Sequence, residues 1–371
     1  MHEDDEYRAL VTGPAFVVRS YRALLEVTGA DRASWLHNLT TNQVKNLGAG
    51  EGNYAFVLNV QGRILFDVNV LVRAESIWLD LDRRFLETAK KHFSKYAITE
   101  DVTVVDRSAE FVRFGLVGPK AVALIAELGA PNALALPTLG QSAIEWNDPN
   151  RRRQDQGRRR EPADTNVDQN RDCQGTVHAA ATVSRSMPVT VLVVRHDFCG
   201  PFAVELFVPT ECADEFRRAM IEPHRAIPVG DDAVQVLRIE AGIPWPGHEI
   251  TEEYLPAETR QLERAVNYQK GCYLGQEVVE RMRSRHVVAR QLVGLRIDGP
   301  AIPALKSEIS DPGGKPIGQV TSVCRSIALQ SAVGLGYVKT SSSAAATPLR
   351  LTWADGAADS VVVNLPFTSL P

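Results

Sequence analysis

The sequence predicts an α+β fold that ends in a small β-barrel. Strand-like and helix-like segments are interleaved through the first part of the chain without a regular strand–helix–strand rhythm, which favours α+β layers over a parallel sheet. After Arg290 the pattern changes to short apolar strands separated by Gly, Pro and Ser, which is typical of a small barrel. With 371 residues, of which 44% are hydrophobic, the chain can bury one large core or two or three smaller ones.

Apolar periodicity predicts the individual elements. Residues 53–60 and 63–72 form two strand patterns joined by Gln61 and Gly62, which predicts a hairpin because Gly62 can take the positive φ of a tight turn. Asp31 is a candidate N-cap for the helix that follows it. Helices are expected over residues 31–42, 83–96, 120–129 and 211–222, and further strands over residues 22–29, 76–81, 102–106, 112–118, 189–197 and 203–210.

Residues 147–187 interrupt this pattern. Within it, residues 147–175 are rich in arginine and acidic residues and almost free of apolar ones, so burial cannot offset the ordering entropy. We therefore expect a disordered surface insertion. Its two Arg-Arg-Arg clusters could contact a phosphate backbone, but acidic residues are mixed in throughout and favour a solvated loop.

Charge and cysteine content exclude several classes of protein. The net charge of −4 gives no global attraction to nucleic acid or anionic lipid. The acidic N-terminus resembles neither a secretory signal nor a transit peptide, and no stretch reaches the roughly 18 apolar residues of a membrane span, so we expect a cytoplasmic protein. The five cysteines include no Cys-x-x-Cys pair and no zinc-type Cys/His spacing, so we expect no metal site and no disulfide scaffold.

The motif KGCYLGQE, Lys270 through Glu277, is the first candidate for chemistry. Gly271 and Gly275 break the chain around Cys272, and the following residues predict a helix with acidic residues early and arginines late. A helix N-terminus and the neighbouring Lys270 both favour a thiolate, which is the reactive form of cysteine. The alternative is a turn in which the cysteine has no function.

Two acidic residues in apolar surroundings are the other candidates. Asp67 lies within an apolar strand pattern and is either on an exposed strand face or directed into a cavity to pair with a ligand nitrogen. Glu240 is either a solvated acid late in a helix or a carboxylate at a pocket wall, able to hold an amidine or guanidine edge by two hydrogen bonds.

Together these stretches resemble the folate-binding YgfZ family, which serves iron–sulfur cluster assembly, and more distantly the glycine-cleavage T-protein, an aminomethyltransferase that uses tetrahydrofolate. The resemblance is carried by LEVTGADRASWLHNLTTNQV, LNVQGRILFDV, KGCYLGQE, and IGQVTS with GLGYV. It implies a three-lobed ring around a central opening that holds the pterin. Two α+β lobes would lie within residues 1–289, with the barrel over residues 290–371.

The resemblance also implies site residues and a cofactor, tetrahydrofolate or another reduced folate. Glu240 corresponds to a T-protein glutamate that contacts the pterin, and further folate contacts are expected from Asp67, Asn59, Lys270 and Arg281. Cys272, Lys270 and Asp67 are the expected catalytic residues. Arg281 belongs to a basic run that either receives the glutamate tail of the folate or is a solvated helix end.

Three functions remain open at this point. The favoured one is a tetrahydrofolate-binding accessory protein for synthesis or repair of iron–sulfur clusters, whose partners are client proteins and the assembly machinery. The second is a tetrahydrofolate-dependent aminomethyltransferase or demethylase, and the third is a folate-dependent docking partner without chemistry. The T-protein has two consecutive aspartates where this chain has Phe66 and Asp67, and it lacks the KGCYLGQE cysteine, so both features point away from the transferase.

Overall fold

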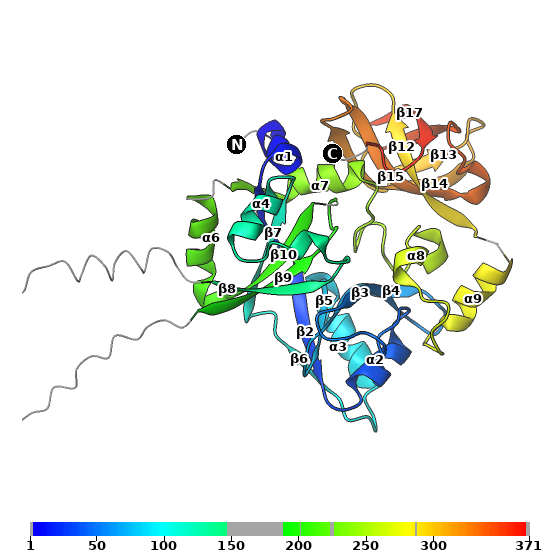
Figure 1. Ribbon diagram of the computed structural model, residues 1–371. Coiled ribbons are helices and arrows are strands. Elements are labelled where there is room, and N and C mark those ends of the chain that lie inside the picture. The colour runs from blue at the N-terminus through cyan, green and yellow to red at the C-terminus, as the bar shows by residue number, and fades with distance from the viewer. Residues whose placement is uncertain (1–2, 147–187, 201, 223–225, 286–287, 369–371) are drawn as a thin grey trace, which may run out of the picture.

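The computed structural model describes residues 3–146, 188–200, 202–222, 226–285 and 288–368, and Figure 1 shows its arrangement. Two α+β lobes are joined to a C-terminal β-barrel. The sequence therefore predicted the fold class correctly. The expected insertion over residues 147–187 lies outside the described residues, so its conformation stays a prediction.

The first lobe is built on a five-stranded antiparallel sheet in the order β3-β4-β5-β2-β6. Its apolar core lies between this sheet and two helices. Asp31 precedes the first of these helices, but its side chain does not cap it and instead accepts a hydrogen bond from the backbone N–H of Asp101. The elements are β2 (Arg22–Thr28), α2 (Arg32–Leu39), β3 (Gly52–Leu58), β4 (Ile64–Val72), β5 (Ile77–Asp82), α3 (Leu86–Lys95) and β6 (Thr103–Asp106).

The hairpin between β3 and β4 is the one that the sequence predicts. Gly62 has a φ of 72°, in the left-handed region that favours glycine. The side-chain oxygen of Asn59 accepts hydrogen bonds from the backbone N–H groups of Gln61 and Arg63. These contacts hold the turn closed.

The second lobe contains a six-stranded sheet in the order β11-β1-β7-β10-β9-β8. Its central strands are buried on both faces because helices and the first lobe cover them. The strands are β1 (Ala15–Val18), β7 (Phe111–Val117), β8 (Gln141–Trp146), β9 (Val189–Arg195), β10 (Ala203–Pro209) and β11 (Ile227–Val229). The helices of this part of the chain are α1 (Glu3–Thr12), α4 (Ala121–Glu127), α6 (Ala213–Ile221) and α7 (Asp231–Glu240).

The C-terminal unit is a closed six-stranded barrel with its own apolar core. A long connection that carries α8 (Leu262–Ala265) and α9 (Gln276–Arg285) leads to it from α7. Its strands are β12 (Arg290–Ile297), β13 (Glu308–Ser310), β14 (Pro316–Ser326), β15 (Ser331–Lys339), β16 (Pro348–Trp353) and β17 (Gly356–Val363).

Two apolar clusters fix the lobes to one another. One joins α1 and α7 to the barrel, and the other fills the space between the two sheets and the connection around α8 and α9. The space between the lobes is therefore bounded by rigid, buried strands. Among the described residues, no helix combines the length and apolar character that crossing a membrane requires.

Candidate functional site

A pocket lies where the two α+β lobes meet. Its walls come from the strands of the first lobe, from the loop after β9 and from the connection that follows α7. Its lining includes Arg19, Tyr21, Arg22, Tyr54, Asp67, Asn69, Asp82, His196, Phe198, Trp245 and Arg264. The pocket thus combines aromatic walls with a dense set of polar groups, as ligand sites at lobe junctions do.

Asp67 is the candidate acid that the structure brings to this pocket. It lies on β4, where it is only 6% exposed. Oδ2 accepts a hydrogen bond from the hydroxyl of Tyr54 at 2.9 Å, whereas Oδ1 has no hydrogen-bond partner among the described residues. Burial raises the pKa of Asp67, although Arg22 and the Tyr54 hydrogen bond oppose this shift. A buried carboxyl group with one free oxygen can accept a hydrogen bond or a proton from a ligand nitrogen.

A network of buried ion pairs lies beside the pocket. Arg22 binds both oxygens of Asp80, at 3.0 and 2.7 Å, and Arg19 binds Glu205 at 2.8 Å. Arg113 bridges the two acids, with Nη2 3.0 Å from Asp80 and 2.9 Å from Glu205. These guanidinium groups hold the pKa of Asp80 well below its usual range despite its burial.

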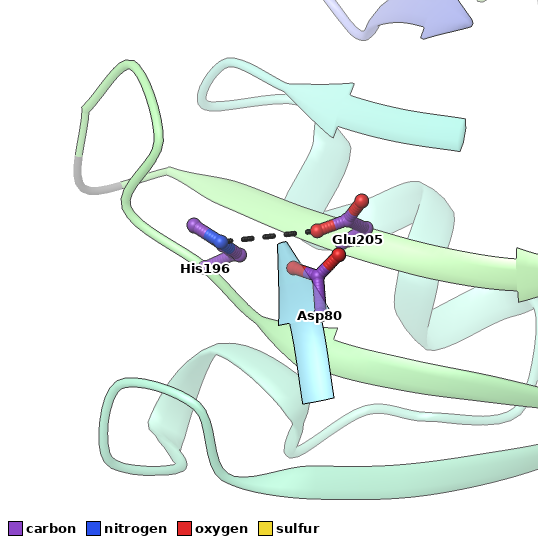
Figure 2. A group of neighbouring side chains, drawn as sticks. All are labelled: Asp80, His196 and Glu205. Atoms are coloured by element: carbon purple, nitrogen blue, oxygen red, sulfur yellow. Dashed lines mark ion pairs between the residues drawn. The ribbon is translucent and has the colours of Figure 1, made fainter. Parts of the chain in front are cut away.

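Asp80, His196 and Glu205 form the one group among the described residues whose side chains could together hold a metal ion. Figure 2 shows how the three side chains converge, with ligand atoms within 4.8 Å of one another. The carboxylates already face three guanidinium groups, so a further cation would be repelled. We interpret the group as part of the ion-pair network.

Cys272 lies outside the pocket, in the loop that leads into α9. It is the one exposed cysteine of the four in the described residues. Gly275 has a φ of 82°, and a Cβ there would lie 2.7 Å from the carbonyl oxygen of Asn59, so only glycine fits between the loop and the β3–β4 hairpin. The loop is thus fixed against the first lobe with its thiol exposed.

Lys270, which the sequence predicts to act beside the thiol and the folate, is buried next to α2. Its side chain is buried, and Nζ donates to the backbone carbonyls of His37, Thr40 and Asn42 at the end of α2. Burial, with a smaller effect of Lys45, lowers the pKa of Lys270 to about 7. Three carbonyl acceptors nevertheless require the three donors of an ammonium group. Lys270 therefore caps α2, and its charge is directed at the helix end.

Glu240 also lies away from the pocket. It is fully buried at the end of α7, where it accepts hydrogen bonds from the hydroxyl of Tyr7 at 2.5 Å and from that of Ser326 at 2.6 Å. Tyr7 belongs to α1 and Ser326 to barrel strand β14. This carboxylate ties together two helices and the barrel, and it is not among the residues that line the pocket.

The two remaining candidates also make contacts outside the pocket. Asn59 organises the hairpin turn and donates to Glu252. Arg281 is exposed on α9 and pairs with Glu277 one turn earlier on the same helix. Of the predicted site residues, Asp67 is the one that lines the pocket.

Comparison with known families fits this architecture. The GCVT N-terminal domain model matches residues 3–144, and the model of the glycine cleavage T-protein C-terminal barrel domain matches residues 290–368. The chain carries both domains of the T-protein superfamily.

Individual relatives of this superfamily align along most of the chain. An aminomethyltransferase of Chloroherpeton thalassium is 25% identical over 98% of this chain and 89% of its own length. A putative chloroplastic transferase of Arabidopsis thaliana is 24% identical over 91% of this chain and 68% of its own length. The crystal structure of the glycine cleavage system aminomethyltransferase T of Bartonella henselae has a TM-score of 0.78 at 19% identity, covering 99% of this chain and 89% of that one. The likeness at this identity shows a shared fold.

The ion-pair network beside the pocket was missed at the level of sequence. Asp80, His196 and Glu205 belong to three different segments, and only folding brings them together. A signal was nevertheless present, because Asp80 and Glu205, like Asp67, are acidic residues within apolar strand patterns.

Proposed function

We propose that the protein binds a reduced folate in the pocket between its lobes and transfers a one-carbon unit between that folate and a substrate amine. The membership of the T-protein superfamily and relatives named aminomethyltransferase support this reaction class. The observation that carries the proposal in this chain is the buried, unpartnered Oδ1 of Asp67 in the pocket. This fits a ligand that presents an N–H group.

Asp67 would hold or move the proton of the reacting amine. Burial raises the pKa of Asp67, so its carboxyl group exchanges a proton closer to neutral pH than an exposed aspartate does. Tyr54 fixes the orientation of the carboxyl group through Oδ2 and leaves Oδ1 for the ligand. Tetrahydrofolate, when bound, supplies the nitrogen that carries the one-carbon unit.

The aromatic walls suit a flat heterocycle. Tyr21 and Trp245 lie with ring centroids 5.7 Å apart, and Trp245 is anchored by a hydrogen bond from Nε1 to the carbonyl of Phe198 at 2.9 Å. These residues are held before any ligand arrives, which reduces the entropy lost on binding.

Two measurements test the proposal. Titration with tetrahydrofolate and with folinic acid should change the native tryptophan fluorescence, because Trp245 lines the pocket. Incubation with tetrahydrofolate and N-methyl amines carrying a labelled methyl carbon should then transfer the label to the folate. Binding without any transfer would support a folate-dependent accessory role instead.

One observation favours a second candidate, an accessory protein for synthesis or repair of iron–sulfur clusters. Cys272 is exposed on a loop held between the first lobe and α9. An exposed thiolate can bind iron, sulfide or a client thiol transiently. The partners would be iron–sulfur client proteins and their assembly machinery. Growth of cells that depend on a four-iron enzyme, with and without Cys272, tests this role.

A further inference from the structure

His196 carries a second unpartnered group in the pocket. The imidazole is 7% exposed at the end of β9, and Nδ1 has no hydrogen-bond partner among the described residues. The nearest acidic oxygen, Oδ1 of Asp197, is 3.9 Å away, which is too long for a hydrogen bond. Whether Nδ1 is a donor or an acceptor depends on the tautomer of the ring.

The ion-pair network fixes that tautomer through Asn69. Arg22 holds Asp80 as a carboxylate, and Oδ2 of Asp80 accepts a hydrogen bond from Nδ2 of Asn69 at 2.8 Å. A carboxylate only accepts, so the amide nitrogen, not the amide oxygen, must face Asp80. The same amide nitrogen lies 2.9 Å from Nε2 of His196.

Asn69 therefore donates one hydrogen to Asp80 and the other to Nε2 of His196. Nε2 is then an acceptor, and the ring hydrogen resides on Nδ1. The contact of Nε2 with Glu205 seen in Figure 2 does not favour the other tautomer, since its length of 3.8 Å exceeds a hydrogen bond. Burial, followed by the positive charge of Arg19, lowers the pKa of His196 well below its usual value, so the ring stays neutral.

We propose that His196 is a specificity-determining residue whose Nδ1–H donates a hydrogen bond to an uncharged carbonyl oxygen of the pocket ligand. A carboxylate ligand would bring a second negative charge beside Asp197, whose Oδ1 is already paired with Arg264 at 3.0 Å, whereas a carbonyl oxygen brings none. The identity of this carbonyl group rests on the proposed function: if the ligand is a reduced folate, the group is the carbonyl of the pteridine ring. His196 would supply a donor and Asp67 an acceptor, a pair that matches a ring with both C=O and N–H groups.

Two substitutions of His196 distinguish the effect of the Nδ1–H donor from the effect of the size of the ring. The side-chain amide of His196→Asn can place an N–H where Nδ1 lies, whereas that of His196→Gln reaches the place of Nε2. The ligands are tetrahydrofolate and its 4-amino analogue, in which a donor replaces the ring carbonyl. The wild-type protein should prefer the 4-oxo ligand by about tenfold or more, since a site built around a hydrogen bond rejects the analogue that lacks it.

The preference should fall to about threefold or less in His196→Gln and be largely retained in His196→Asn. Equal preferences in the wild type and His196→Gln would overturn the inference while leaving folate binding intact. Failure of the wild type to bind either ligand would instead overturn the proposed function, and the carbonyl assignment with it.

A spectroscopic measurement on the ligand-free wild type does not depend on the variants folding. Nitrogen-15 NMR distinguishes the two neutral tautomers of a histidine ring. The resonances of His196 should show a neutral ring with the hydrogen on Nδ1 at neutral pH. A hydrogen on Nε2, or a charged ring, would overturn the inference whatever the binding data show.

Discussion

Tyr54 donates its hydroxyl hydrogen to Oδ2 of Asp67 at 2.9 Å, so one carboxyl oxygen is held while the other has no partner among the described residues. Both residues line the pocket between the lobes. This pair defines the reactive end of the pocket in our account. It also makes Asp67 costly to the folded state, because a buried carboxyl group with one unsatisfied oxygen loses hydration.

Replacing Asp67 by Asn should not destabilise the protein at neutral pH and should raise its free energy of unfolding by up to about 1–2 kcal/mol. The pKa of Asp67 is raised in the folded state, so its contribution to stability is fully present below the unfolded pKa and is lost as the pH rises through the folded pKa. The difference in stability between variant and wild type should therefore grow from acid toward neutral pH. Urea unfolding at several pH values measures it, and a variant that is less stable at neutral pH would contradict the account.

Replacing Glu240 by Gln should destabilise the protein by about 1–3 kcal/mol and leave folate affinity unchanged. The substitution puts an amide where the carboxylate accepts from Tyr7 and Ser326, at the seam between helices and barrel. Tyr7→Phe is the matched control, since it removes one of the same hydrogen bonds from the other side. The two losses of unfolding free energy should be less than additive in the double variant. Weakened folate binding with unchanged stability would contradict this structural role and show that Glu240 contacts the folate.

Replacing Lys270 by Met should lower the free energy of unfolding by about 1–3 kcal/mol, because buried carbonyls at the end of α2 lose their donor. The alkylation rate of Cys272 should change by less than about twofold, since the ammonium group is engaged at the helix end and not at the thiol. Iodoacetamide labelling of the folded variant measures this rate. A tenfold slower reaction with unchanged stability would show that Lys270 activates the thiol after all.

Cys272 should be alkylated faster than the three other cysteines of the described residues, because it alone among them is exposed. Burial raises the pKa of Cys199 to about 12, so that thiol should remain unmodified in the folded protein. Cys173 lies outside the described residues, so the labelled site must be assigned by peptide mass. Cys272→Ser should keep folate affinity and, if the accessory role is real, fail to support a four-iron client enzyme in cells. Cys199→Ser is the control expected to support it.

Deleting residues 150–180 and joining the ends with a short Gly/Ser linker should change the free energy of unfolding by less than about 1 kcal/mol. Trp146 of β8 and Val189 of β9 are directly opposite each other in an antiparallel pair, so a short linker can span the gap. Circular dichroism and thermal unfolding test this expectation. An insoluble product would show that the deleted residues contribute to the folded body.

The fold could be predicted from the sequence because local patterns determine most of it. The β3–β4 hairpin, α3 and the barrel strands each show their period or their turn residues directly. The site could be predicted only in part. A lone acid in an apolar strand predicts Asp67 as a candidate. The same pattern at Asp80 and Glu205 belongs to residues that form ion pairs with three arginines, and those partners cannot be predicted from local sequence.

The positions of Lys270 and Glu240 illustrate what sequence cannot supply. Both are polar residues of candidate motifs, and the structure buries both. Their partners, the end of α2 for Lys270 and a barrel serine for Glu240, come from segments whose proximity depends on how the lobes pack. Their place in the motifs predicts Lys270 and Glu240 as candidate site residues, but it does not predict which groups they bind.

If Asp67 binds a reduced folate between the lobes, its replacement should weaken binding in an equilibrium titration with tetrahydrofolate. Wild type, Asp67→Asn and the exposed control Asp355→Asn should be compared by tryptophan fluorescence. Asp67→Asn should lose about 1–3 kcal/mol of binding free energy, roughly a 5- to 150-fold weaker Kd, while Asp355→Asn should bind as the wild type does. Equal affinity of all three proteins, or no binding by the wild type, would contradict this role of Asp67.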